Sequence, residues 1–207
     1  MRRRREVARR RADLARVLEE HSPPYRVNVG SGRMELAGWI NTDVDRVRPY
    51  LDATKPWPMP AGSVGHVFSD NMIEHLKLDQ ARAFLREAHR AMAPGGRIRI
   101  VTPDPEGVAR AYLLDAEAAE AMTERHRRAG YRMEHRVDLL RVIYHESGHC
   151  QGYLFDEAAL RFELEAAGFR DVVRAELGRS SDPVLAGLDT RTGPGDASLL
   201  LAIEAMA

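Results

Sequence analysis

The sequence contains a single cysteine, few aromatic residues and no excess of charge of either sign. Because Cys150 has no second cysteine to pair with, an internal disulfide is excluded, which is typical of a reducing compartment. No stretch approaches the roughly 20 apolar residues of a membrane span, and the first residues lack the apolar core of a signal peptide. The 31 basic residues balance 31 acidic ones, so net charge indicates neither a nucleic-acid nor an acidic partner. We therefore expect a cytoplasmic protein with no specific nucleic-acid partner.

Basic residues are nevertheless unevenly distributed, with a cluster at the start of the chain. Eight arginines lie in the first 16 residues: Arg2, Arg3, Arg4, Arg5, Arg9, Arg10, Arg11 and Arg16. With Leu14, Val17 and Leu18 they predict a basic amphipathic helix over residues 1–22, followed by a main domain over residues 23–207. This helix could contact an anionic membrane surface, a lipid-linked acceptor or RNA. The alternative is a solvated helix packed over one edge of the domain.

Apolar segments of strand length alternate with segments of helical spacing. Strands are expected at residues 26–29, 38–42, 47–51, 64–68, 97–102, 172–177 and 198–203, and helices at 78–92, 106–128 and 156–167. Such alternation predicts an α/β protein, a sandwich of helices around a mostly parallel sheet.

The first strand runs directly into glycines, and an acidic residue follows the second strand. Glycines allow backbone N–H groups to approach a ligand, and a carboxylate one strand later can bind a ribose diol. Gly30-Ser31-Gly32 and Asp43 therefore predict a nucleoside-cofactor site at the carboxyl ends of parallel strands. Only the ten residues 33–42 separate the two motifs, so the first crossover must be unusually short. Glu35 occupies the position of a third glycine, which argues against a dinucleotide.

Taken in order, these motifs resemble the class I S-adenosylmethionine-dependent methyltransferases, in particular the small stand-alone group with a type 11 domain. Further similar segments are Ser69-Asp70-Asn71-Met72-Ile73-Glu74-His75-Leu76 and Glu87 to Gly96, which ends in Pro94-Gly95-Gly96. The resemblance extends over about residues 26–205. It implies a Rossmann-like three-layer sandwich with a seven-stranded sheet whose last strand is antiparallel, and S-adenosylmethionine as the cofactor.

The resemblance also implies roles for individual residues. The expected cofactor-binding set is Gly30, Ser31 and Gly32 for the methionine part, Asp43 with the adjacent Val44 for the ribose, Asp52 and Ala53 for the adenine, and Asn71 beside the sulfonium. Asp45 is the alternative to Asp43, because the ends of predicted strands are uncertain by a few residues.

Methyl transfer from a sulfonium depends mainly on alignment of the acceptor, but a hydroxyl acceptor usually needs a general base. His149 is the first candidate, followed by His75 and His145, and each could instead be structural. The expected acceptor is a hydroxyl of a small molecule or glycan, since this group often accompanies genes of sugar and secondary metabolism. We expect no metal, and Glu74 has either a site role or caps the following helix.

Two other functions fit the sequence. One is a catalytically silent methyltransferase fold that acts as a partner-binding subunit. The other is a zinc hydrolase, because His145-Glu146-Ser147-Gly148-His149 matches the H-E-x-x-H pattern. That pattern requires a continuous helix, which Ser147-Gly148 disfavours.

Overall fold

The computed structural model describes residues 2–45, 49–193 and 195–207. The strands are β1 (Tyr25–Val29), β2 (Ile40–Thr42), β3 (Val64–Asp70), β4 (Met92–Pro103), β5 (Arg170–Ala175) and β6 (Leu200–Met206). The α-helices are α1 (Arg2–Glu20), α2 (Leu78–Ala91), α3 (Pro105–Leu114), α4 (Ala116–Arg128), α5 (Asp138–His145), α6 (Glu157–Ala166) and α7 (Asp196–Leu199). Two 3₁₀ turns complete the set, η1 (Ile73–His75) and η2 (Glu146–Gln151).

The strands form one sheet in the order β2-β1-β3-β4-β6-β5. Strands β2, β1, β3 and β4 are parallel, whereas β6 runs antiparallel to both β4 and β5. The expected Rossmann-like α/β class, the mostly parallel sheet and the antiparallel last strand are therefore confirmed. The short first crossover is also present, because residues 30–39 connect β1 to β2 without a helix.

The prediction of seven strands was wrong by one, because the described residues form six. The expected strand at 47–51 falls partly on residues 46–48, which lie outside the described part of the chain, and residues 49–51 are not in a strand. Pro49 has no N–H to donate to a ladder, and the backbone N–H of Tyr50 donates to the Arg10 carbonyl of α1 at 3.1 Å. This segment is therefore bonded to the N-terminal helix and, through the Pro49 carbonyl at 3.2 Å, to the Asp43 N–H directly after β2, but it forms no strand.

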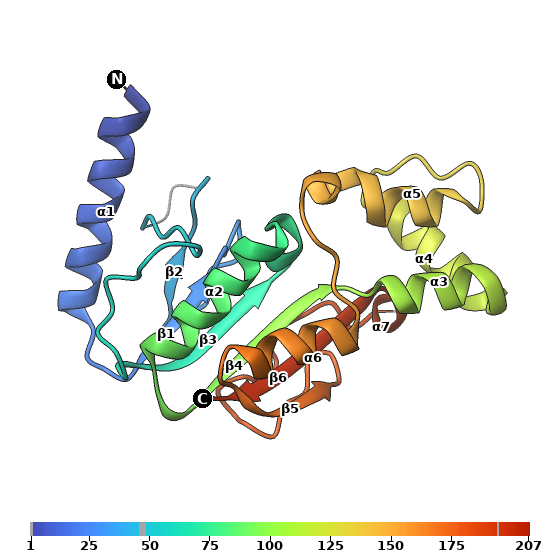
Figure 1. Cartoon of the computed structure of the whole chain (residues 1–207). Coiled ribbons are helices and arrows are strands. Elements are labelled where there is room, and N and C mark those ends of the chain that lie inside the picture. The colour runs from blue at the N-terminus through green and yellow to red at the C-terminus, as the bar shows by residue number, and fades with distance from the viewer. Residues whose placement is uncertain (1, 46–48, 194) are drawn as a thin grey trace.

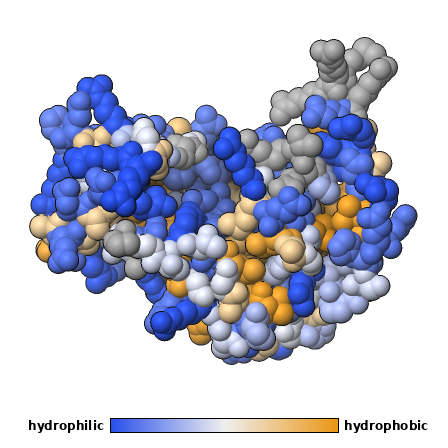
Figure 2. Space-filling model, turned by 180° about the vertical axis from the view of Figure 1, so that it is seen from behind, coloured by the Kyte–Doolittle hydropathy of each residue, from blue (hydrophilic) through white to orange (hydrophobic). Residues whose placement is uncertain are grey.

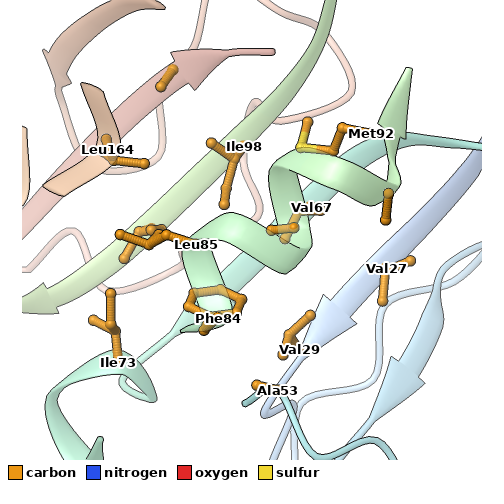
Figure 3. Close-up of a cluster of buried hydrophobic side chains, with 14 of the residues drawn as sticks. Val27, Val29, Ala53, Val67, Ile73, Phe84, Leu85, Met92, Ile98 and Leu164 are labelled. Carbon is orange, nitrogen blue, oxygen red and sulfur yellow. The ribbon is translucent and has the colours of Figure 1, made fainter. Parts of the chain in front are cut away.

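One face of the sheet is covered by α2 and α6 (Figure 1). Helix α2 presents Phe84 and Leu85, both fully buried, to the strand residues Val67 and Ile98, as Figure 3 shows. The buried residues of α2 include Ala81, Phe84, Leu85 and Ala88, the spacing of one face of a helix. This apolar layer is the larger part of the core.

The opposite face carries a buried ionic cluster as well as apolar residues. The Arg99 guanidinium donates to both carboxylate oxygens of Asp189, at 2.7 and 2.9 Å, and also to Glu204. Asp189 belongs to the long segment before α7, which the cluster ties to the sheet.

Seen from behind, the surface is mainly hydrophilic with an apolar patch toward one side (Figure 2).

Helices α3, α4 and α5 lie beyond the end of β4 (Figure 1). The single helix expected over 106–128 is two helices, because Asp115 leaves the helical conformation and its side chain caps α4 by accepting from the Ala118 N–H at 2.9 Å. Among the helices that the structure describes, none combines the length and apolar content needed to cross a membrane.

Candidate active site

A cavity of about 1340 Å³ lies at the carboxyl ends of β1, β2 and β3. It is lined by the loops after these strands, by residues 50–54 and by one side of α1. Seven of the eight residues expected to bind the cofactor lie on its wall: Gly30, Gly32, Asp43, Val44, Asp52, Ala53 and Asn71. Three segments that are separate in sequence therefore meet at one cleft, as the sequence predicted.

The glycine loop at the base of the cleft has a backbone that only glycine adopts easily. Gly30 has φ +68°, and a Cβ atom there would lie 2.2 Å from the Cγ of Met72. A side chain at this position would therefore collide with the residue that follows β3, as well as straining the backbone. Gly30 and Gly32 line the cleft without side chains, so their backbone is available to a ligand.

Asp43 joins the glycine loop to the end of β2. Its Oδ2 accepts a hydrogen bond from the Gly32 N–H at 2.9 Å, and its Oδ1 accepts one from the Asp45 N–H at 2.6 Å. The residue is buried but borders the cleft. Each carboxylate oxygen can accept more than one hydrogen bond, so Asp43 can hold the loop and still bind a ribose hydroxyl. Asp45 is exposed at the same wall.

Helix α1 forms part of the cleft, which the sequence did not predict. Val7, Ala8 and Arg11 line the cavity. The buried Arg10 guanidinium donates to the backbone carbonyls of Asp43 at 2.7 Å and Val44 at 3.1 Å. The helix therefore fixes the loop that carries the proposed ribose ligand. The only sequence signal was its amphipathic pattern, which indicates packing but not the partner.

The remaining expected cofactor ligands differ in position. Asp52 lines the cleft and accepts hydrogen bonds from the backbone N–H and hydroxyl of Thr54, at 3.0 and 2.7 Å. Asn71 lines it in a left-handed conformation, with φ +49°. Ser31 lies instead on a smaller cavity of about 290 Å³ behind the loop, which Arg191 also lines.

Two of the three histidines expected to act as bases come together beside the cleft. His75 lines it, and the ring centroids of His75 and His149 are 5.2 Å apart. His149 lies behind, where its Nδ1 is 2.8 Å from the carbonyl oxygen of Ile143. Burial, and secondarily the charge of His149, lowers the pKa of His75.

Glu74 completes this cluster, and its side chain is fully buried. Burial raises the pKa of Glu74 to about 8, against the opposing effect of hydrogen bonds from its backbone and from Thr102. The Thr102 hydroxyl donates to Oε2 at 3.2 Å, and Oε1 lies 3.9 Å from Nε2 of His149. Glu74 belongs to η1 and does not cap α2, whose N-cap residue is Lys77.

His145 is separate from this cluster. It is exposed at the end of α5, and the chain then changes to the 3₁₀ turn η2, within which Gly148 has φ +85°. The H-E-x-x-H segment is therefore not a continuous helix, and the arrangement of a zinc hydrolase is not formed.

The fold is Rossmann-like, with a large cleft at the carboxyl ends of its strands, and comparison with known proteins supports this fold. Residues 35–100 match the sequence model of a family described as "Methyltransferase domain". No curated protein matches the chain.

Solved structures give the same result for the fold. A SAM-dependent methyltransferase from Archaeoglobus fulgidus aligns over 99% of this chain and 94% of its own, with 17% identity and a TM-score of 0.57. Phosphoethanolamine N-methyltransferase 2 from Haemonchus contortus, solved with phosphomonomethylethanolamine and S-adenosylhomocysteine, aligns over 94% of this chain with 13% identity and a TM-score of 0.51. This chain spans 52% of that enzyme's length. The chain therefore has the fold of the class I S-adenosylmethionine-dependent methyltransferases, and the resemblance seen in the sequence is confirmed.

Proposed function

We propose that this protein binds S-adenosylmethionine in the large cleft and methylates a hydroxyl group of a small molecule or glycan. The observation that carries the proposal is the hydrogen bond between the Gly32 N–H and Asp43, which joins both halves of the expected cofactor site in one cavity. The family match and the shared fold support methyl transfer, and the complex of the Haemonchus enzyme supports the choice of cofactor.

The residues fit this cofactor from end to end. The backbone at Gly30 and Gly32 borders the place for the methionine moiety, Asp43 can accept from the ribose hydroxyls, and Asp52 with Ala53 borders the adenine end. When bound, the cofactor supplies an electrophilic methyl group, and its carbon–sulfur bond electrons remain on sulfur after transfer.

The acceptor site is proposed to lie where His75 borders the cleft. A hydroxyl placed there can donate its hydrogen bond to the cluster formed by Glu74, His75 and His149, which loosens the O–H bond as the oxygen forms its new bond to carbon. The size of the cavity supports a second ligand, because a drug-sized molecule usually occupies about 300–1,000 Å³ and this cleft measures about 1340 Å³.

Titration calorimetry with S-adenosylhomocysteine tests the first half of the proposal, and transfer of labelled methyl to hydroxyl-bearing sugars and phenols tests the second. His75→Ala should retain cofactor affinity and reduce turnover by about 10²-fold or more. The matched control is His145→Ala, an exposed histidine outside the cluster, which should behave as the wild type.

Two results would contradict the proposal. Failure to bind S-adenosylhomocysteine would refute the cofactor site. Binding without transfer to any hydroxyl acceptor would favour the catalytically silent binding subunit.

A further inference from the structure

The Glu74, His75 and His149 side chains form a compact group of potential metal ligands. One donor atom from each of the three lies within 4.8 Å of the others. We propose that this group binds a divalent transition-metal cation, and that the cation holds the oxygen of the methyl acceptor at the cofactor cleft. The H-E-x-x-H pattern indicated a metal bound by His145 and His149, whereas this group joins His149 to Glu74 and His75.

The buried carboxylate of Glu74 has an oxygen that needs a partner. Oε1 is inaccessible to solvent and has no hydrogen-bond partner among the described residues, whereas Oε2 accepts from the Thr102 hydroxyl. An isolated buried carboxylate is costly, and buried charges are normally paired or coordinate metals. The free oxygen is directed toward His149, at 3.9 Å from its Nε2.

His149 is held in the orientation of a metal ligand. The Ile143 carbonyl can only accept, so at 2.8 Å the Nδ1 atom of His149 carries the proton. In the neutral ring this leaves the lone pair on Nε2, the atom nearer to Glu74. Metal-binding histidines usually donate their other ring N–H to such a carbonyl or to a carboxylate.

The separation between the two donor atoms also suits a shared ion. At 3.9 Å, Nε2 of His149 and Oε1 of Glu74 are too far apart for a hydrogen bond. Two ligands that each lie about 2.0–2.2 Å from one cation are roughly 3–4 Å apart. Only a small closure is needed to bring all three donors to that spacing.

Backbone packing fixes the two turns that carry these ligands. A Cβ atom on Gly152, directly after η2, would lie 1.8 Å from the Glu74 carbonyl oxygen of η1. A Cβ on Gly148 would lie 3.5 Å from Nδ1 of His75. The two 3₁₀ turns therefore approach through glycines, which holds the ligands from η1 and η2 beside each other.

Three protein ligands leave coordination positions open, as in catalytic metal sites. Two imidazoles and one carboxylate suit Zn²⁺, Fe²⁺ or Mn²⁺ better than Mg²⁺. Because His75 borders the cleft, the open positions face the space for the acceptor. Coordination would lower the pKa of an acceptor hydroxyl, and its proton would pass to water. The oxygen would then bond to the methyl carbon as the carbon–sulfur bond breaks, with the bonding electrons remaining on sulfur. Activation of the acceptor rests on the proposed function, whereas cation binding itself does not. In this arrangement His75 binds the cation instead of accepting a hydrogen bond from the acceptor.

The test uses the full chain after removal of metals with EDTA. Mn²⁺ binding is followed by loss of the free-ion electron paramagnetic resonance signal, and Zn²⁺ binding by competition with a chromophoric chelator. We expect one equivalent of cation per chain, with affinity reduced at least about 10-fold in Glu74→Gln and His75→Ala. His145→Ala is the matched control and should bind as the wild type. Because His75 is exposed, its variant remains informative if Glu74→Gln fails to fold.

The outcomes separate the two proposals. Absence of both Mn²⁺ and Zn²⁺ binding, or affinity unchanged in His75→Ala, would overturn the metal site. Titration of S-adenosylhomocysteine into the same metal-free and loaded samples reports on the cofactor site independently. Cation binding without S-adenosylhomocysteine binding would support the metal site and refute the methyltransferase proposal.

Discussion

Replacing Asp43 by asparagine is the sharpest test of the cofactor site. The carboxylate accepts one backbone N–H on each oxygen, from Gly32 and from Asp45, and borders the cleft. Asparagine keeps one accepting oxygen, and its NH₂ group would face the other backbone N–H. Hydrogen bonds to a charged group contribute about 1.5–3 kcal/mol. We therefore expect Asp43→Asn to weaken S-adenosylhomocysteine binding by about 2 kcal/mol, or roughly 30-fold.

Asp45→Asn is the matched control for this experiment. Asp45 lies at the same wall and is exposed, and its backbone N–H, which donates to Asp43, is unaffected by the substitution. Its affinity should stay within about 3-fold of the wild type, since an exposed charge contributes little. Titration calorimetry at one fixed salt concentration measures both variants, with circular dichroism to confirm folding. If Asp43→Asn binds like the wild type, or Asp45→Asn loses more affinity, then Asp43 does not hold the ribose.

Two further substitutions test the contacts that support the site and the sheet. Arg10→Met removes the donors to the Asp43 and Val44 carbonyls, so we expect S-adenosylhomocysteine affinity to fall about 10-fold, a loss of about 1.4 kcal/mol. The control Arg9→Met changes an exposed side chain and should bind like the wild type. If Arg10→Met binds as tightly as that control, α1 does not fix the loop. Arg99→Met leaves Asp189 and Glu204 buried without their cation and should lower the free energy of unfolding by about 3–5 kcal/mol in urea titrations; a loss below about 1 kcal/mol would show that the cluster is not a buried ionic pair.

The strand ends of the site could be predicted because their residues lie within short, ordered motifs. Gly30, Gly32 and Asp43 directly follow β1 and β2, and parallel strands bring their carboxyl ends together. The fold class followed from the same alternation of strands and helices. Ser31 could not be placed, because the side toward which a loop residue points depends on backbone angles that no sequence pattern specifies.

Long-range contacts account for what the sequence did not reveal. The bond from Arg10 to the Asp43 carbonyl joins residues 33 positions apart. Glu74 and His149 likewise meet only because η1 packs on η2. Asp189, in the long segment before α7, pairs with Arg99 in the core although the two residues are 90 positions apart. The acceptor, the cytoplasmic location and weak contact of the N-terminal arginines with anionic membranes stay predictions.

The three-residue strand β2 has a consequence for how the cleft responds to its ligand. This strand lies at the edge of the sheet and pairs with β1 alone among the described strands. So short an edge is expected to open locally at a lower free energy than β3 or β4, and its amide hydrogens should exchange with deuterium earlier. A ligand that binds only the closed form slows that exchange. When a ligand binds in the cleft, the amide hydrogens of Asn41 to Asp43 should therefore be the first to become protected from exchange, before any change elsewhere in the sheet.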